Sequence, residues 1–453
     1  MTSLVLLLLA HNPSLVTTTG YLDSRTQVAE TKADGTPAVT ELVEGNVQLK
    51  LTPHERVTVQ VDASLFWQGA WWIHGGDRDL PQYRPSIVLS EAYVDVTPQD
   101  SVRVLVGKKR IVWGSGLAFN PTDLLNPPKD PTDPTFQRAG AWLGLLEFPF
   151  EKVTLSLAAA GKATRSYAGL PTALVVVPDQ PTFEATQGWV PDLRDDEAHW
   201  AFTSRLYLLV ADTDVTVSYA YTNVFNDAFP NKSRAGLSLS RTFGGLEAHG
   251  EALFQTGSAR VDVTRSCINQ PQVCFLQGVP IATRPDLDAT YFNLSALAGL
   301  RYFFEDGGIL TGEYFFNGDG HDAEGFKDVA YMVKRYPAQV QAALGASQDP
   351  GTPQKFAFTP LRRHYAVLSY LKPQLFDDWT VMLSLLTGLE DLSMQALAQV
   401  TWAPWEWLNL TAAVYVPLPG VPDWGVTIDG AQYGELTLNP FGTRVLFQAR
   451  VYY

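Results

Sequence analysis

Hydrophobic and polar residues alternate with a period of two along most of this chain. Val57–Leu65 alternates strictly, Leu246–Ala252 follows the same pattern, and Leu408–Tyr415 keeps an apolar face at every even position. Successive side chains of a strand point to opposite faces of its sheet, so the pattern predicts strands with one apolar and one polar face. A helical pattern is expected only over Met332–Leu344.

About 18 such segments can be counted, and the connections between them alternate between short and long. The short ones include Gly244-Gly245 and Asp377-Asp378. The long ones cover 74–86, 117–140, 164–198, 223–232, 257–289, 318–363 and 418–441. Transmembrane barrels have short periplasmic turns and long extracellular loops. We therefore predict an all-β fold, a transmembrane antiparallel up-and-down β-barrel of about 18 strands, with 16 as the alternative.

The last strand, from Gly442 to Tyr453, has an apolar face that ends on an aromatic residue. An even number of strands predicts that it closes the barrel by pairing with the strand near Gly20. Its apolar face should then meet lipid, while Arg444, Gln448 and Arg450 should face the lumen.

Composition agrees with a membrane barrel. Only 18% of the residues are charged, 12% are aromatic, and the mean hydropathy is −0.04. No apolar run approaches the ~18 residues that a spanning helix needs. Tryptophans flank predicted strand ends at Trp67, Trp71, Trp72 and at Trp402, Trp405, Trp407. We expect these to form interfacial girdles, with an ordinary protein core as the alternative. The net charge of −14 argues against a nucleic-acid partner.

The apolar run Leu4–Ala10 predicts a signal peptide over residues 1–17, followed by the barrel over 18–453. A buried N-terminal strand or helix is the alternative reading of that run. The two cysteines, Cys267 and Cys274, close a short loop, which predicts a local disulfide in an oxidising compartment rather than a metal site.

The polar parity of each strand should line the lumen with side chains of both signs. Such a lining would produce an electric field across the pore, which would narrow the selectivity of the channel to polar solutes. The alternative is that these charges only solvate and cross-link the wall. The candidates for pore lining or constriction are Glu91, Asp95, Arg103, Lys108, Lys109, Arg110, Arg205, Arg234, Arg444 and Arg450.

One strand is unusual because Lys108, Lys109 and Arg110 are three consecutive cations. At least one of them should point toward lipid unless a bulge at Gly107 or Gly114 redirects the strand. The loop 117–140 that follows is rich in Pro and Asp and rather apolar, so it could fold into the barrel as a constriction. The alternative is an exposed loop beside a charged rim strand.

A family resemblance rests on three stretches. Ser90–Val96, Val106–Gly114 and Asn120–Pro127 resemble the EAY(V/L) strand, the G(R/K)(Q/K)xxxWG strand and the NPxDLxNP loop of Gram-negative porin-like outer-membrane proteins. These are broadly similar to alginate-export-type and other substrate channels. The resemblance covers about residues 90–135 and implies a barrel and a channel, without assigning ligand residues.

We expect no enzyme and no cofactor. No histidine has a spacing that singles out a nucleophile and base, and Ca²⁺ at 192–197 or 317–322 is less expected than solvated loops. The predicted function is an outer-membrane channel for small polar or charged solutes. Its partners would be outer-membrane lipid, lipopolysaccharide and the barrel-assembly machinery. The alternatives are an export barrel for a polymer such as an anionic polysaccharide, with periplasmic partners, and a structural or surface-binding barrel with an occluded lumen.

Overall fold

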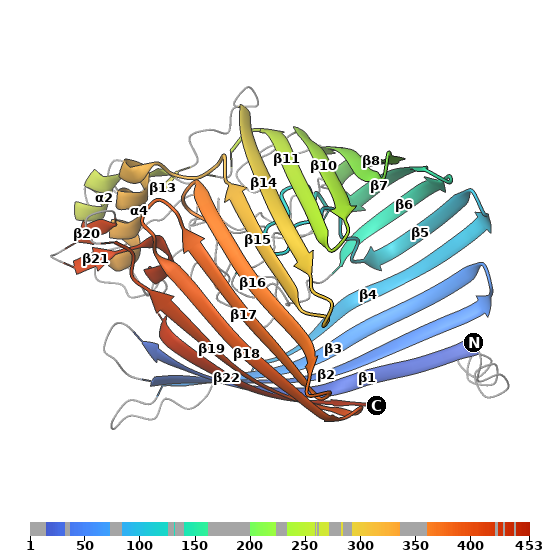
Figure 1. Ribbon diagram of the computed structural model, residues 1–453, viewed down its shortest axis with the longest axis horizontal. Coiled ribbons are helices and arrows are strands. Elements are labelled where there is room, and N and C mark those ends of the chain that lie inside the picture. Colours follow the sequence, from blue (N-terminus) through green and yellow to red (C-terminus); the bar gives the residue numbers. More distant parts are fainter. Residues whose placement is uncertain are drawn as a thin grey trace.

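The described strands form one closed ring. The computed structural model describes residues 15–31, 37–72, 84–125, 131, 140–161, 200–222, 233–258, 260, 262–270, 282–283, 292–335, 360–421, 425–428, 431–438 and 441–453. Within these residues, eighteen strands pair antiparallel, each with its neighbour along the chain, and the last returns to the first (Figure 1). The predicted fold class and strand number are therefore confirmed.

The ring is built from the following strands: β1 Val16–Thr31, β2 Pro37–His54, β3 Val57–Trp72, β4 Arg84–Gln99, β5 Val102–Lys109, β6 Ala141–Pro149, β7 Val153–Gly161, β8 Trp200–Val210, β9 Thr213–Thr222, β10 Ser233–Phe243, β11 Leu246–Thr256, β14 Phe292–Phe303, β15 Ile309–Phe316, β16 His364–Leu375, β17 Trp379–Gly388, β18 Met394–Trp405, β19 Leu408–Leu418 and β22 Phe441–Tyr452. Strand β1 begins two residues before the predicted start of the barrel, and residues 1–14 of the predicted signal peptide lie outside the described residues.

The seam between β1 and β22 closes the ring as the last strand predicted. Tyr21 pairs with Tyr452, and the register continues to Ala29 opposite Arg444 before a shift at Thr31. At the end of the seam, Gly20 and Tyr453 exchange two backbone hydrogen bonds of 3.2 and 3.1 Å. A Cβ at position 20 would lie 2.3 Å from the Asn46 backbone carbonyl oxygen on β2, so this close approach requires glycine.

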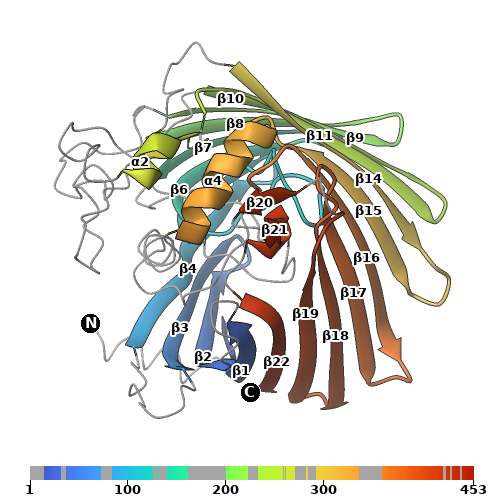
Figure 2. The ribbon, with the colours of Figure 1, turned by 90° about the vertical axis from the view of Figure 1, so that its left-hand side faces the viewer.

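The short connections lie together at one end of the barrel. The β8–β9 turn consists of Ala211 and Asp212, both with positive φ (48° and 58°), which is the two-residue hairpin geometry that matches strand twist. At the other end, the long connections carry a small outer cap (Figure 2). The outer cap consists of β12 Asp262–Val263, α2 Arg265–Asn269, β13 Ala282–Thr283, α4 Ala323–Arg335, β20 Val426–Ile428, β21 Ala431–Tyr433 and η2 Glu435–Thr437.

Helix α4 organises the outer cap. Its Phe326 and Ala330 are buried against Val426 of β20, with Tyr433 packed beside them. The helix therefore starts nine residues before the expected Met332, and residues 336–344 of that expectation lie outside the described residues. Among the described residues, none of the helices is long and apolar enough to cross a membrane.

The two faces of the ring differ in polarity. The outward rows carry exposed apolar side chains, for example Leu65 (53% exposed), Ile87 (77%) and Phe447 (56%). The inward rows carry buried polar groups such as Glu44 and Asn46, with the Asn46 amide donating to Asp62 at 2.6 Å. An apolar exterior of strands this long suits the hydrocarbon layer of a bilayer.

Aromatic side chains gather at the short-turn end. Trp379 stacks on Trp402 with ring centroids 5.6 Å apart, and Trp405 stacks on Trp407 at 5.1 Å. All four are exposed on the outward face, as an interfacial girdle requires. Trp67 is likewise exposed, while the side chains of Trp71 and Trp72 lie outside the described part of the chain.

Candidate functional site

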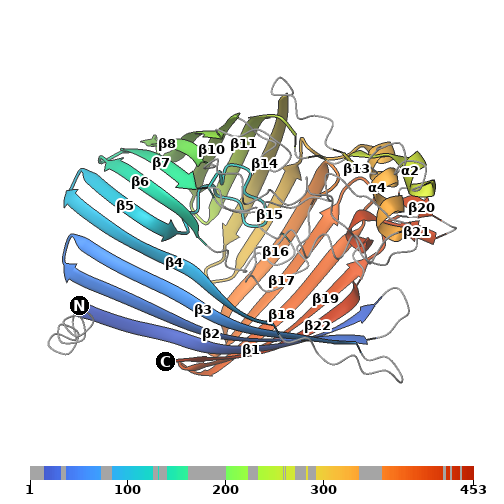
Figure 3. The ribbon, with the colours of Figure 1, turned by 180° about the vertical axis from the view of Figure 1, so that it is seen from behind.

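The cation-rich strand β5 ends early, and the chain then leaves the wall. Gly107 has a φ of +133°, and a Cβ there would lie 2.2 Å from the Ala92 carbonyl oxygen on β4. The strand stops at Lys109, and β6 starts only at Ala141. Residues 110–125, here called the inserted segment, pass instead into the interior of the ring, where Figure 3 shows them as a teal coil.

Two inward carboxylates hold the inserted segment through its backbone. Glu251 on β11 accepts from the N–H groups of Ser115 (2.5 Å), Gly116 (3.0 Å) and Thr122 (3.1 Å), and from the Thr122 hydroxyl (2.7 Å). The second carboxylate belongs to Glu313 on β15. It accepts from the N–H groups of Leu117 and Ala118, the latter at 3.0 Å.

These bonds explain why the segment can remain irregular inside the barrel. A chain without secondary structure exposes N–H groups that must find partners when they are buried. A carboxylate can accept several such bonds, and charge-assisted bonds are stronger than neutral ones. His249 Nε2 lies 3.2 Å from the Glu313 carboxylate, so that side chain is held from β11 as well. Gly114 (φ +99°) lets the chain turn toward Glu251, where a Cβ would lie 2.8 Å from Oε1.

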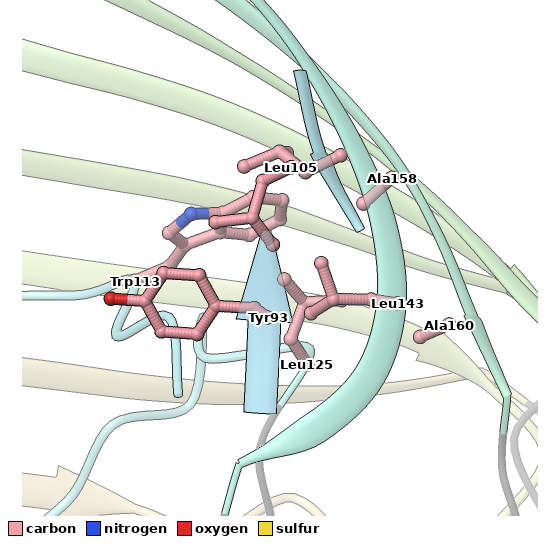
Figure 4. Close-up of a cluster of buried hydrophobic side chains, with 8 residues drawn as sticks. Tyr93, Leu105, Trp113, Leu125, Leu143, Ala158 and Ala160 are labelled. Carbon is pink, nitrogen blue, oxygen red and sulfur yellow. The ribbon is translucent and has the colours of Figure 1, made fainter. Parts of the chain in front are cut away.

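The near part of the segment is anchored by apolar packing. Trp113 and Leu125 are buried against inward side chains of β4 to β7 (Figure 4). The cluster consists of Tyr93, Leu105, Trp113, Leu125, Leu143, Leu145, Ala158 and Ala160. On β6, Leu143 and Leu145 face inward beneath the segment while Trp142 is exposed, so this strand is apolar on both faces. The inserted segment thus removes an apolar part of the inner wall from water.

The far part of the segment reaches the opposite wall. The Phe119 ring stacks on Phe315 of β15 with centroids 4.3 Å apart, and lies 5.8 Å from Tyr365 of β16. In the ring, β5 is the fifth strand and β16 the fourteenth of eighteen, so the two stand half a circumference apart. The segment therefore crosses the interior, and it must narrow any passage through the barrel.

Charged side chains lie on the inner wall beside the start of the segment. Arg103 on β5 contacts Asp95 at 2.6 Å and Glu147 at 2.8 Å, and Lys109 Nζ lies 3.8 Å from the Asp95 carboxylate. Lys109 also lies 4.0 Å over the Tyr93 ring. The backbone N–H of Arg110 donates to Glu91 Oε1 at 2.9 Å. Five of the predicted lining residues, Glu91, Asp95, Arg103, Lys109 and Arg110, are therefore brought together.

Lys108 was predicted to line the pore, but the register places it elsewhere. It pairs with Trp142, which is exposed on the outward face, while Val106 of the same row is also exposed. Lys108 is thus the one of the three consecutive cations that lies on the lipid side. This agrees with the expectation that at least one of them should point toward lipid. A lysine stem can lie along apolar surface while its ammonium group reaches polar surroundings.

The remaining predicted cations lie in three different places. Arg205 is 5.7 Å from the Trp113 ring, and Arg234 donates to the Leu124 carbonyl at 3.3 Å, so both contact the inserted segment. Arg444 lies 4.8 Å over the Tyr415 ring. Arg450 binds Asp23 across the seam at 3.0 Å. These last two belong to the wall of β19, β22 and β1 rather than to the cluster at β5.

Glu251 and Glu313 are not among the ten candidates predicted from the sequence. Their alternation with apolar neighbours reveals the face they occupy. Nothing local reveals that their partners lie 129 to 196 residues earlier in the chain. The one signal in the sequence is indirect: an irregular apolar loop has backbone N–H groups without partners in a helix or sheet, and these need acceptors when the loop is buried.

The other sequence expectations concern the outer cap. Cys267 on α2 is disulfide-bonded, and Cys274, the only other cysteine of the sequence, lies outside the described residues. Within the described residues, no group of three or more His, Cys, Asp or Glu side chains could hold a metal ion. In the 317–322 segment, Asp319 accepts from Gln255, Ser258 and Asn293 at 2.7 to 2.9 Å. The 192–197 segment lies outside the described residues.

Comparison with known proteins adds a likeness of fold. The chain matches no family model and no curated protein. Among solved structures it is similar to Pseudomonas aeruginosa OccK5 (OpdH), with 11% identity over 96% of this chain and 98% of that chain and a TM-score of 0.47. It is also similar to Pseudomonas aeruginosa OccK7 (OpdD), with 10% identity over 97% and 98% and a TM-score of 0.47. A Rhodopseudomonas blastica porin variant gives 9% identity over 97% and 100%, with a TM-score of 0.38. The strand pairing of this chain, rather than these likenesses, carries the argument about its fold.

Proposed function

We propose that this protein is a non-enzymatic outer-membrane channel for passive or selective diffusion of small polar or charged solutes. The observation that carries the proposal is the inserted segment, which is held across a closed, polar-lined ring by Glu251 and Glu313. A barrel of about 18 strands is wide enough to hold water, so the segment would set the size of solute that passes.

The charges beside the segment would give the passage its selectivity. Arg103 is shared by two carboxylates, and Lys109 stands within 3.8 Å of one of them. Cations and anions so close together impose a strong local field on a narrow aqueous path. A solute that passes this point would therefore replace part of its hydration shell with contacts to these charged side chains and to the rest of the polar inner wall.

The environment of the channel follows from its surface. The apolar exterior with aromatic rings at its end suits the outer membrane, with lipid and lipopolysaccharide around the barrel. We also propose that the barrel-assembly machinery inserts this protein into the outer membrane. No observation on the described residues favours a polymer-export barrel with periplasmic partners or a purely structural barrel.

Planar-bilayer recording tests the channel. The full chain should conduct, and replacing residues 114–122 with a short Gly-Ser linker should raise the single-channel conductance severalfold. A lack of conductance in both proteins would rule out the proposed function.

Charge reversal tests the cluster. Lys109→Glu and Arg110→Glu should each shift the reversal potential in a salt gradient toward cation preference, because each replaces a positive group beside the constriction with a negative one. Lys152→Glu, in an exposed short turn, makes the same change of charge away from the cluster and should leave the potential nearly unchanged. Equal shifts in all three variants would contradict a role for the cluster.

A further inference from the structure

Another buried carboxylate lies where the outer cap meets the barrel. Glu435 begins η2, in the connection between β19 and β22, and is 2% exposed. Its Oε1 atom accepts from the Tyr365 hydroxyl at 2.5 Å, from Leu361 N–H at 2.6 Å and from Arg362 N–H at 3.3 Å. These bonds tie the outer connection to the start of β16.

Other charged groups surround Glu435 from the elements packed against it. Asp391, fully buried between β17 and β18, accepts from Glu435 N–H at 2.8 Å. Arg362 lies 3.5 Å from Asp391 and 2.5 Å from Glu390. Two carboxylates, of Glu390 and Asp391, thus share the Arg362 guanidinium, whereas Glu435 accepts from the Arg362 backbone N–H. Glu435 Oε2 is buried, and no described atom forms a hydrogen bond with it.

Burying a carboxyl oxygen without a hydrogen-bond partner costs far more free energy when the carboxyl group is ionised than when it is protonated. Burial, with Asp391 beside it, raises the pKa of Glu435 from 4.5 to about 8. The side chain is therefore held in its neutral form over most of the physiological range.

This contact adjoins the tip of the inserted segment. Leu436, the residue after Glu435, is buried in one apolar cluster with Ala118, Phe119, Tyr365 and Leu386. Tyr365 therefore contacts the segment through its ring and Glu435 through its hydroxyl. Displacement of η2 would uncover one side of Phe119.

We propose that Glu435 is a proton-operated latch that holds the outer connection 431–438 against the tip of the inserted segment. When Glu435 is neutral, η2 stays packed on Tyr365 and Phe119. When it ionises, the carboxylate gains by leaving its buried place for water, and η2 releases the tip.

The sign of the pH dependence follows from linkage. The latched form binds the proton up to about pH 8, whereas a released, solvated Glu435 ionises near 4.5. The ratio of released to latched molecules should therefore rise by up to about tenfold per pH unit between these values. It should level off above pH 8, where both forms are ionised. Latch stability is thus fully present only at low pH and is lost as pH rises.

Hydrogen exchange of the full chain in lipid bilayers tests the latch without relying on conduction. The exchange rate of residues 431–438 is compared between the native protein and Glu435→Gln at the same pH, from pH 5 to 9. The exchange rate of the native protein divided by that of Glu435→Gln should rise toward pH 8 and then level off. Glu324→Gln, which removes an exposed carboxylate of α4, should keep the native pH response. A ratio that stays constant with pH would overturn the latch.

A second variant covers the case in which Glu435→Gln does not assemble. Tyr365→Phe removes a donor that favours the ionised carboxylate, so its Glu435 should ionise at higher pH than that of the native protein. The exchange rate of residues 431–438 in Tyr365→Phe, divided by the native rate at the same pH, should therefore stay constant up to about pH 8 and rise above it. A ratio that stays constant above pH 8 would count against the proposal.

Conductance gives a separate readout that rests on the proposed channel function. Native channels should show more frequent or larger openings as pH rises from 5 to 8, and Glu435→Gln should not. A conducting channel with a flat exchange ratio would leave the channel intact and remove the latch. A rising ratio without conductance at any pH would leave the latch and remove the channel.

Discussion

Arg450 on the last strand donates to the buried Asp23 carboxylate on the first strand, with Nη2 and Oδ2 3.0 Å apart. Asp23 also accepts from Arg25 within β1 and from Gln448 on β22. The bond thus joins the two ends of the chain across the seam, inside the barrel, and adds side-chain contacts to the backbone ladder that closes it.

Asp23→Asn should weaken the seam. The amide keeps the shape of the side chain but leaves Arg450 without its carboxylate partner and Arg25 with only Glu44, 3.6 Å away, at a cost of about 2 kcal/mol in the free energy of unfolding. Urea unfolding in lipid vesicles measures this loss. Asp100→Asn, which removes the exposed partner of Arg56 in a short turn, is the matched control and should leave the unfolding midpoint unchanged. Equal midpoints for Asp23→Asn and the native protein would contradict the assignment.

Glu251→Gln should loosen the inserted segment without unfolding the barrel. A glutamine amide nitrogen would face N–H donors of Ser115 or Thr122, so at least one backbone group would lose its acceptor. We expect higher and noisier single-channel currents. Glu44→Gln is the control, because it changes an inward carboxylate of β2 that accepts from Tyr21 and Ser64 rather than from the inserted segment. Similar recordings from both variants would show that the carboxylate at 251 is not the anchor.

Trp113→Ala should detach the near part of the segment. Trp113 is 2% exposed, and its removal leaves a cavity among Tyr93, Leu105 and Leu143, which costs on the order of 3 kcal/mol. Because the strands pair without it, the loss should be local. Limited proteolysis should cut the variant within 110–125 while the ring stays intact. Trp405→Ala, on the outward face, should remain resistant within that segment, and cleavage in both would argue for a general loss of stability.

Cys267→Ser should disturb only the outer cap. Cys267 is buried on α2, whose neighbour Asn269 accepts from Tyr331 of α4 at 2.9 Å. Without the disulfide, the connection that carries α2 has more conformations available when it unfolds, so local unfolding becomes more favourable. Faster amide exchange is expected in α2 and α4, with no change in β11 or β14. Faster exchange in those strands would mean that the cap also stabilises the barrel.

The ring of strands was predictable because its signals are local. Alternation such as Val57–Leu65 shows which face of a strand is apolar, and turns such as Gly244-Gly245 show where a hairpin reverses. Closure followed from the even number of strands, and the pairing of Tyr21 with Tyr452 confirms it. These features need no knowledge of residues far away in the chain.

The site was predictable only in part because its contacts are long-range. The composition of 117–140 suggested an inward loop. The described residues 117–125 contact Glu251 and Glu313, whereas 126–130 and 132–139 lie outside the described residues, so the full range stays a prediction. The insertion also begins earlier, at Arg110. Lys108 was predicted to line the pore together with its two cationic neighbours, although alternation along β5 places it in the outward row of Val106.

The separation between the inserted segment and its anchors has a consequence for biogenesis. The segment belongs to the first third of the chain, but Glu251, Glu313 and Tyr365 belong to strands that follow much later. The constriction cannot form until β11, β15 and β16 have joined the growing sheet. Whichever strands pair first, the tip of the segment lacks its acceptors and its aromatic partners until these three strands are in place, so narrowing of the passage follows their assembly.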